Sequence, residues 1–437
     1  SSGAPFGVPG GGGDLTAMES YFGRATYNYN EKYFLEGSLR RDGSSKFRYK
    51  EDRWGTFWSV GAGWRLIEEN FMQNAGSWLN DLKLRASYGV IGNQSGISNY
   101  AGYQLWSYGA NYSTVGNGTG IPISYTLSQG AVVNTALTWE NTHTFDAGID
   151  FSLWNRRING SIDYYNKNTV NSVFAQPIAS SLGQNSLTLN SARIVNRGFE
   201  LEMNIDVIRN KNVRWNIGLN GTHYRTILMK IPPGVASEAL GGKFTAAIDG
   251  WGIASGGASS AGQIMYLRGE GMDYYNLYLY KYAGVDQTTG LPLFHHTVTQ
   301  KDHEDDLFKD DAIGSIVNTT NYTLATRYPM GSAIPKWIGG FTTSFQYKNF
   351  DFMAILAYQI GGKFLSVEYA NHLYRSGNIG NGLSAELIGN TWTPDNNGAK
   401  FPMTFYGDTY YTGGSTHGSS QYSDMSLFSA SYLNVKN

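Results

Sequence analysis

Two stretches of the sequence carry aromatic and polar side chains together, the combination that binds a sugar or a short peptide. They are NYAGYQLWSYGANY (residues 99–112) and IDGWGIASGG (residues 248–257). Aromatic rings offer a flat apolar platform, and carboxylates and amides offer fixed hydrogen-bond partners. The alternative is that these rings pack loop against loop or against a partner above them. We predict substrate contacts at five of the residues: Tyr103, Trp106, Tyr108, Asp249 and Trp251.

The seven histidines make a weaker case for catalysis or metal binding. Hydrolysis needs a nucleophile, a base and an orienting group within mutual reach, and no nucleophile motif accompanies His143 or His223. LFHHTVTQKDHEDD (residues 293–306) combines histidines with acidic residues, as cation sites do, but without a defined ligand spacing. A solvated loop is the preferred interpretation. We predict no catalytic residue, metal or cofactor and no enzyme activity, with a membrane hydrolase left as an alternative.

The elements that must position these stretches are β-strands with two different faces. In residues 22–47 the odd positions of 25–29 and 33–39 are Ala, Tyr, Gly and Leu, whereas the even positions include Arg24, Glu36 and Arg40. Successive side chains of a strand point to opposite faces, so one face is apolar and the other is polar. The same alternation of about 8–12 residues recurs at further places: 55–66, 82–90, 144–153, 158–165, 198–207, 213–224, 339–347 and 350–360.

Composition supports a β-structure and excludes several other classes. Charged residues make up only 15% of the 437 residues and aromatic residues 14%, with 55 Gly and 31 Tyr; strands and polar loops favour this mixture more than helices do. The net charge of −1 gives no reason to expect a nucleic acid partner. The absence of Cys excludes disulfides and thiol chemistry. No apolar run approaches the roughly 18–20 residues of a transmembrane helix.

The predicted connections alternate between short and long. Short breaks follow several strands, at 30–32, 154–156, 209–212 and 348–349. Long polar connections are expected at 91–142, 166–197, 225–272, 298–335 and 361–427. Weaker strands near 273–283, 291–297 and 428–437 would keep this alternation. Residues 67–80 would be a longer connection at the end that carries the short ones. The dipeptide Asp42-Gly43 predicts a tight turn. Such regularity is expected of antiparallel strands that run up and down a membrane barrel.

The apolar face must lie against either another sheet or lipid. A soluble sandwich also alternates, but its strands average about five or six residues and its outer face is the charged one. Long amphipathic strands in lipid must close into a barrel because every backbone group has to be paired. We therefore predict an all-β transmembrane antiparallel barrel. Leu35, Trp64, Ile149 and Met203 would face lipid, and the charged residues would face a wet lumen: Glu36, Arg65, Asp150 and Glu202.

A series of motifs follows one another across nearly the whole chain. They are YFGRATYNYNEKYFLEGSLRRDGSSKF, RWGTFWSVGAGWRL with IEENFM, LNDLKLRASYGVIGNQ, LTWENTHTFDAGIDFSLWNRRINGSIDYYNKNT, NRGFELEMNID, YKYAGVDQTTGLPLF, IPKWIGGFTTSFQYKNFDF, and WTPDN with SYLNVKN. The order of these motifs resembles that of the SusC/RagA-like TonB-dependent outer-membrane transporters of Bacteroidota, and the motifs are specific as a set although weak singly.

The resemblance implies a location in the outer membrane and an architecture larger than this chain. It implies a 22-stranded barrel filled by a plug domain, covered by a SusD-like surface lipoprotein and energised by TonB, with dimers of such pairs expected. Residues 1–20 would be a Gly-rich loop, and residues 21–437 would supply roughly strands 8–20 without the plug. We therefore expect a fragment of a longer polypeptide.

The function implied by the resemblance is active import of oligosaccharides or other large nutrients. A peptide importer of the RagA type, and a passive porin or secretion barrel, remain alternatives. The sequence does not distinguish a glycan from a peptide, because the long connections that would contact either ligand are rich in both aromatic and amide side chains.

Overall fold

The computed structural model describes most of the chain: residues 13–111, 125–129, 133–178, 186–232, 243–248, 265–374, 382–403 and 423–436. Among the described residues, no helix is long and apolar enough to cross a bilayer. The predicted contacts Asp249 and Trp251 lie outside these ranges.

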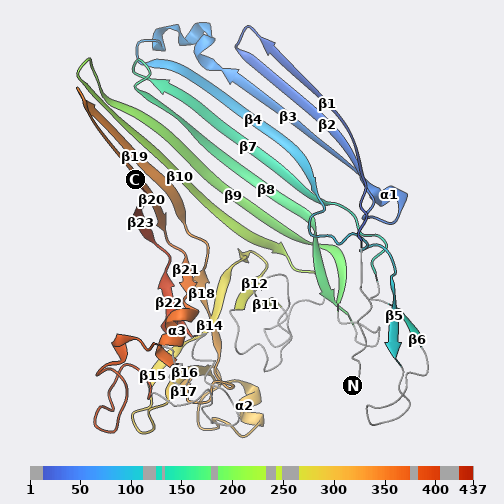
Figure 1. Cartoon of the computed structure of the whole chain (residues 1–437), viewed down its shortest axis with the longest axis vertical. Coiled ribbons are helices and arrows are strands. Elements are labelled where there is room, and N and C mark those ends of the chain that lie inside the picture. Colours follow the sequence, from blue (N-terminus) through green and yellow to red (C-terminus); the bar gives the residue numbers. More distant parts are fainter. Residues whose placement is uncertain are drawn as a thin grey trace, which may run out of the picture.

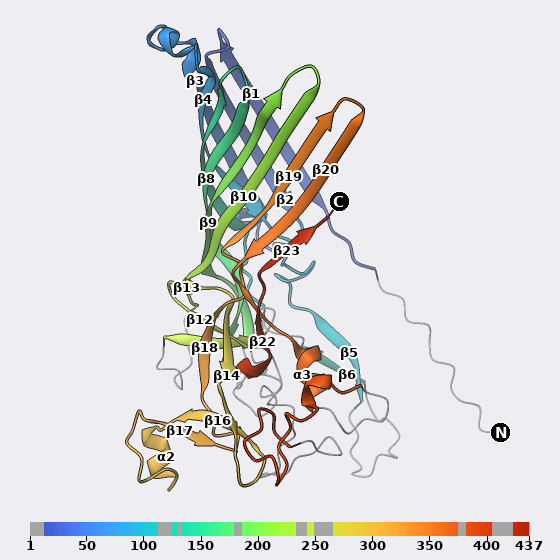
Figure 2. The ribbon, with the colours of Figure 1, turned by 90° about the vertical axis from the view of Figure 1, so that its left-hand side faces the viewer.

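One curved antiparallel sheet forms a wall along most of the molecule (Figures 1 and 2). The strand order follows the chain from β1 to β23, and the short β13 pairs with β10 beyond the β19 contact. The strands are β1 (Met18–Tyr29), β2 (Tyr33–Ser44), β3 (Trp54–Arg65), β4 (Leu79–Asn93), β7 (Glu140–Leu153), β8 (Ile158–Pro177), β9 (Ser186–Arg209), β10 (Val213–Lys230), β13 (Met272–Asp273), β19 (Trp337–Tyr347), β20 (Phe350–Ile360) and β23 (Tyr432–Val435).

Tight turns gather at one end of this wall, which Figure 1 shows at the top. All four predicted short breaks are confirmed, between β1 and β2, β7 and β8, β9 and β10, and β19 and β20. Several turn residues other than Gly have positive φ, including Asn30 (53°), Glu31 (55°) and Lys348 (53°). Turns with positive φ match the right-handed twist of antiparallel strands, so they join neighbours with few residues. Between β3 and β4 the predicted longer connection contains η1 (Leu66–Glu68) and η2 (Asn70–Ala75).

The two faces of the wall differ as the alternation predicts. Pairing registers place Leu35, Ala62 and Ala86 in one row across β2, β3 and β4, and Glu36, Gly61 and Ser87 in the adjacent row. Large side chains on the apolar face are exposed, Leu35 to 55% and Ile149 to 41%. This face therefore packs against no other described part of the chain, as a wall in lipid requires and a sandwich does not.

Small sheets and helices gather at the opposite end, below the wall in Figure 1. The strands form sheets of two to four members. They are β5 (Trp106–Asn111) with β6 (Tyr125–Gln129); β11 (Phe244–Ile248), β12 (Met265–Gly269), β14 (Asn276–Tyr280) and β18 (Arg327–Ser332); β15 (Tyr282–Val285), β16 (Pro292–Thr297) and β17 (Ile316–Thr319); and β21 (Lys363–Leu365) with β22 (Leu427–Ser429). The helices are α1 (Lys50–Arg53), α2 (Gln300–Glu304), α3 (Val367–Tyr374), η6 (Ala385–Leu387) and η8 (Asp424–Ser426).

The structure corrects two predictions about strands. The segments near 273–283 and 291–297 do form strands, but most of their residues belong to small sheets outside the wall. In β14, Leu277, Leu279 and Tyr280 are all buried, so neighbouring positions both face protein rather than alternating between lipid and water. In addition, β8 and β9 extend well into the predicted connection 166–197.

The predicted turn at Asp42-Gly43 is wrong. Both residues lie within β2 and pair with Gly55 and Trp54 of β3. Asp42 is buried and accepts hydrogen bonds from Arg40 Nε at 2.7 Å, so its carboxylate serves a strand contact rather than a bend. The connection from β2 to β3 follows instead at residues 45–53, which include α1.

Candidate functional site

The polar face of the wall carries a network of charges that extends over three strands. Arg85 on β4 forms ion pairs with Asp150 on β7 at 3.0 Å and with Asp163 on β8 at 2.7 Å. On β1 and β2, Arg24 and Glu36 form another pair at 2.9 Å. These charges lie on one face because the pairing registers place each of them in phase with the row of Glu36, Gly61 and Ser87. They give that face a water-compatible surface with fixed donors and acceptors.

Gly148 makes the Arg85 network possible. It pairs with Arg85 across β4 and β7 and with Asp163 across β7 and β8. A Cβ at this position would overlap Asp163 Oδ1 and would lie 2.9 Å from Arg85 Cζ. Any larger residue would therefore displace one partner of the ion pairs.

A hollow of about 440 Å³ lies on this polar face beside the network. Its charged lining residues are Glu36, Lys83, Arg85 and Asp146, and Lys83 Nζ lies 4.6 Å from the centroid of the Phe34 ring. Sequence reasoning assigned the charges to a lumen but did not select these residues as a site. The signal was present in the alternation, since each charged residue lies between two apolar ones.

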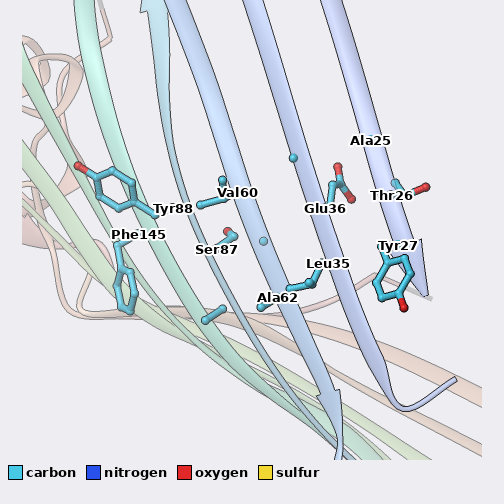
Figure 3. A pocket seen from close by; sticks show the side chains of 13 residues that line it. Ala25, Thr26, Tyr27, Leu35, Glu36, Val60, Ala62, Ser87, Tyr88 and Phe145 are labelled. Carbon is cyan, nitrogen blue, oxygen red and sulfur yellow. The ribbon is translucent and has the colours of Figure 1, made fainter. Parts of the chain in front are cut away.

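The opposite face carries hollows lined almost wholly by carbon. One of about 650 Å³ spans β1, β2, β3, β4 and β7, where Ala25 and Ala62 leave space between Tyr27, Tyr88 and Phe145 (Figure 3). Another, of about 900 Å³, lies near it on the same face. Such surfaces suit acyl chains rather than a polar cargo, so we do not count them as substrate sites.

Three of the predicted contacts lie together at the end of the wall that carries the long connections. Tyr103 is half-buried and its hydroxyl accepts a hydrogen bond from Arg53 Nη2 at 3.3 Å. Trp106 begins β5 and is 56% exposed, and Tyr108 pairs with Leu127 of β6. The structure therefore brings Tyr103, Trp106 and Tyr108 into one segment, in which the Trp106 side chain is exposed and Tyr103 is held in place.

A buried cluster that sequence reasoning missed anchors this segment to the wall. One member, Phe57, lies on β3, and the others come from three connections: Phe47, Ile97, Leu137 and Trp139. The Trp139 indole donates to the Arg53 carbonyl oxygen at 3.1 Å, which ties the cluster to the residue that contacts Tyr103. The cluster fixes the base of the β5–β6 hairpin by burying apolar side chains from three connections.

The histidine-rich segment is not the solvated loop that the sequence predicted. His296 on β16 is 5% exposed and contacts Asp302 Oδ2 on α2 through Nε2 at 3.0 Å. Burial opposes ionisation of the Asp302 carboxyl, but hydrogen bonds from Thr299 and His296 outweigh it, and the pKa of Asp302 lies below its ordinary value. Among the described residues, no group of three or more His, Cys, Asp or Glu side chains could hold a metal ion. This contact stabilises the small β15–β17 sheet.

The two histidines considered for catalysis make other contacts. His143 Nδ1 lies 3.0 Å from the Tyr88 hydroxyl. The His223 ring lies 5.1 Å from the Trp337 ring, and its Nδ1 contacts the Lys336 carbonyl oxygen. Both therefore belong to ring clusters of the wall.

A curved wall with an exposed apolar face, a charged face, tight turns at one end and long connections at the other defines a β-barrel membrane protein. The chain belongs to the family described as TonB dependent receptor-like, beta-barrel, which matches residues 4–290. The predicted SusC/RagA-like membership, all-β barrel fold and outer-membrane location are confirmed.

Curated relatives match most of this chain but only part of their own length. TonB-dependent receptor SusC of Bacteroides thetaiotaomicron is 30% identical over 339 residues, covering 77% of this chain and 30% of SusC. TonB-dependent receptor P3 of Formosa agariphila is 29% identical over 391 residues, covering 89% of this chain and 36% of that receptor. The chain thus spans about a third of the length of these relatives.

A solved structure of the RagAB peptide transporter has the same fold. It superposes with a TM-score of 0.71 at 24% identity, covering 96% of this chain and 40% of the RagAB chain. A RagAB structure in the open-open state gives the same TM-score at 23% identity.

Proposed function

We propose that this chain forms the barrel wall of an outer-membrane importer of the SusC type that takes up oligosaccharides. The observation that carries the proposal is the polar face, where the Arg85 network lies opposite an exposed apolar face. A lumen lined by fixed charges suits a hydrated cargo. The exposed Trp106 beside Tyr103 supports a sugar ligand, because aromatic faces stack on the apolar faces of sugars.

The partners and the energy source belong to the same proposal. A SusD-like surface lipoprotein would cover the end with the long connections, and TonB would act through parts of the protein that this chain does not include. The relatives named above are receptors and a peptide transporter, so we propose transport rather than catalysis.

The test is to isolate the full-length protein with its partners from native outer membranes and to identify the bound ligand by mass spectrometry. We expect an oligosaccharide. A bound peptide in its place would overturn the assignment of a sugar as the cargo, but the proposal of an importer would stand.

Uptake measurements separate active import from a passive pore. Whole cells that express the full-length protein should stop accumulating the identified ligand when the proton gradient is dissipated. Continued entry at the same rate would show a porin and would contradict active import.

A further inference from the structure

A groove of about 680 Å³ opens where two strands of the wall separate. β10 and β19 pair from Val213 and Tyr347 up to Thr222 and Ile338. Beyond this point β10 pairs with β13, while the chain before β19 comes from β18. We call the space between them the rim groove, and its charged lining residues are Arg225, Asp273, Lys336 and Lys363.

The position of the rim groove along β10 corresponds to the outer surface of a bilayer. Val213 begins β10 at the tight-turn end, and His223 lies ten residues further along. At about 3.3 Å per residue and a tilt of about 40°, this is about 25 Å across the membrane, which is the height of the apolar band of a barrel. His223 and the 42% exposed Trp337 lie in ring contact at this level, as aromatic residues of an interfacial girdle do. The groove therefore begins where hydrocarbon gives way to lipid headgroups.

The charge in the groove is positive. Arg225 and Asp273 form an ion pair at 2.9 Å and neutralise each other. Lys363 Nζ donates to the Met330 carbonyl oxygen at 2.7 Å, which orients its ammonium without removing its charge. Within the described part of the chain neither Lys336 nor Lys363 forms an ion pair. Two lysines thus remain to bind an anion.

The backbone beside the lysines requires glycine at two positions. Gly361 and Gly362 have φ of 77° and 75°, a conformation that other residues rarely adopt. A Cβ on Gly361 would lie 3.0 Å from Lys336 Cγ, and one on Gly362 would lie 3.0 Å from the Pro335 nitrogen. The two loops that carry Lys336 and Lys363 therefore approach each other closely and border the groove together.

Apolar residues lie in the groove and beside it, and one of them, Ile360, pairs with Trp337. Phe428 lines the groove and is 38% exposed. The neighbouring Phe364 and Ile360 are 48% and 54% exposed. A ligand that carries an anionic group and a hydrocarbon part would satisfy both the lysines and these side chains.

We propose that the rim groove binds the phosphate-bearing headgroup of an outer-leaflet lipid. The phosphate lies between Lys336 and Lys363, and the acyl chains follow the wall past Trp337 and Ile360. Basic pockets at the level of the headgroups bind anionic lipids in this way. The proposal depends on the barrel lying in a membrane and is independent of the nutrient carried.

The test compares lipid retention by the full-length protein and by the double variant Lys336→Gln/Lys363→Gln. Both are purified in detergent, exchanged into micelles that contain phosphatidylglycerol, and analysed by native mass spectrometry. We expect the double variant to retain at least tenfold less phosphatidylglycerol, since each lysine near anionic lipid contributes about fivefold. A matched control, Lys211→Gln/Lys348→Gln, removes two exposed lysines at the tight-turn end and should retain lipid like the wild type.

Three outcomes would overturn the proposal. They are equal retention by the double variant, equal loss in the control, and displacement of the lipid by millimolar inorganic phosphate, which would indicate a site for a free anion. Lys336→Arg/Lys363→Arg keeps the charge and should restore retention. If the double Gln variant fails to insert, the two single Gln variants carry the same test, each with about fivefold lower retention expected.

Discussion

At the scale of single residues, two positions lead to direct tests: Trp106, as a candidate contact for the ligand, and Gly148, as a requirement of the ion pairs between strands. Trp106 is the clearest ligand-contacting candidate because its ring is 56% exposed at the start of a hairpin whose base is anchored. Gly148 is the clearest structural requirement because the Arg85 ion pairs occupy the space of its missing side chain.

Trp106→Ala should weaken ligand binding. Loss of one stacked ring costs about 1 kcal/mol, or roughly fivefold in affinity. Isothermal titration of the full-length protein with the ligand identified from native membranes measures the effect. Trp78→Ala is the matched control, because Trp78 is similarly exposed, at 49%, but lies at the tight-turn end. Unchanged affinity in Trp106→Ala would contradict a role for this ring.

Gly148→Ala should destabilise the barrel. The added methyl group displaces Asp163 or Arg85, and such overpacking costs about 1–3 kcal/mol of the free energy of unfolding. The loss of stability is measured by heating samples to increasing temperatures before gel electrophoresis and recording the temperature at which the band of the folded barrel disappears. Gly37→Ala is the control, because a Cβ there meets nothing within 4 Å. Equal stability of the two variants would show that the ion pairs can move aside freely.

Among the described elements, α2 contains a titrating group outside the membrane, Asp302, that contributes to the stability of the helix. Thr299 caps the helix, and its backbone and hydroxyl both donate to Asp302 Oδ2 at 2.6 Å. Because the folded pKa of Asp302 is below the ordinary 3.8, its carboxylate stabilises the folded segment above that pH. The contribution is lost as the pH falls through the folded pKa.

Hydrogen exchange of α2 should therefore depend on pH. Protection factors of its amides should be higher at pH 5 than at pH 3 in the wild type. Asp302→Asn cannot ionise, so we expect lower protection at pH 5 and little further loss at pH 3. A variant that keeps the wild-type difference between the two pH values would assign the effect to another group.

At the scale of the whole molecule, one face of the wall meets lipid and the other meets water. Ala86 and Ser87 are exposed neighbours on β4 and lie on opposite faces, in the Leu35 row and the Glu36 row respectively. They provide a direct test of the orientation of the wall, because both lie near the middle of the strand.

Ala86→Arg should impair membrane insertion, whereas Ser87→Arg should be tolerated. An arginine on the lipid face near the midplane costs about 2–4 kcal/mol, but one in the lumen remains hydrated. The amount of folded, heat-modifiable full-length protein in the outer membrane measures both effects. The opposite ranking would place the charged face toward lipid and contradict the barrel.

The alternation of side chains was sufficient to predict the long strands of the wall, their two faces and the four short breaks between them, because each follows from neighbours in sequence. Asp42-Gly43 shows where local reasoning failed: the pair is typical of a turn, but Asp42 is buried in β2 with Arg40. Similarly, β14 has a strand-like sequence, but burial of Leu277 and Leu279 assigns it to a small sheet. Which partner a strand selects depends on residues far away in the chain.

The candidate sites show the same difference between what neighbours in sequence predict and what contacts between distant residues decide. Sequence alone selected Tyr103, Trp106 and Tyr108 as candidate ligand contacts, because aromatic and polar residues that are adjacent in sequence are adjacent in any fold. Only the tertiary structure joined Arg85 to Asp150 and Asp163, and only it brought Lys336 beside Lys363. The sequence determined which side chains lipid and water would meet, since that choice repeats every two residues. Contacts between distant strands were decided by register and by strand divergence, which no local pattern encodes.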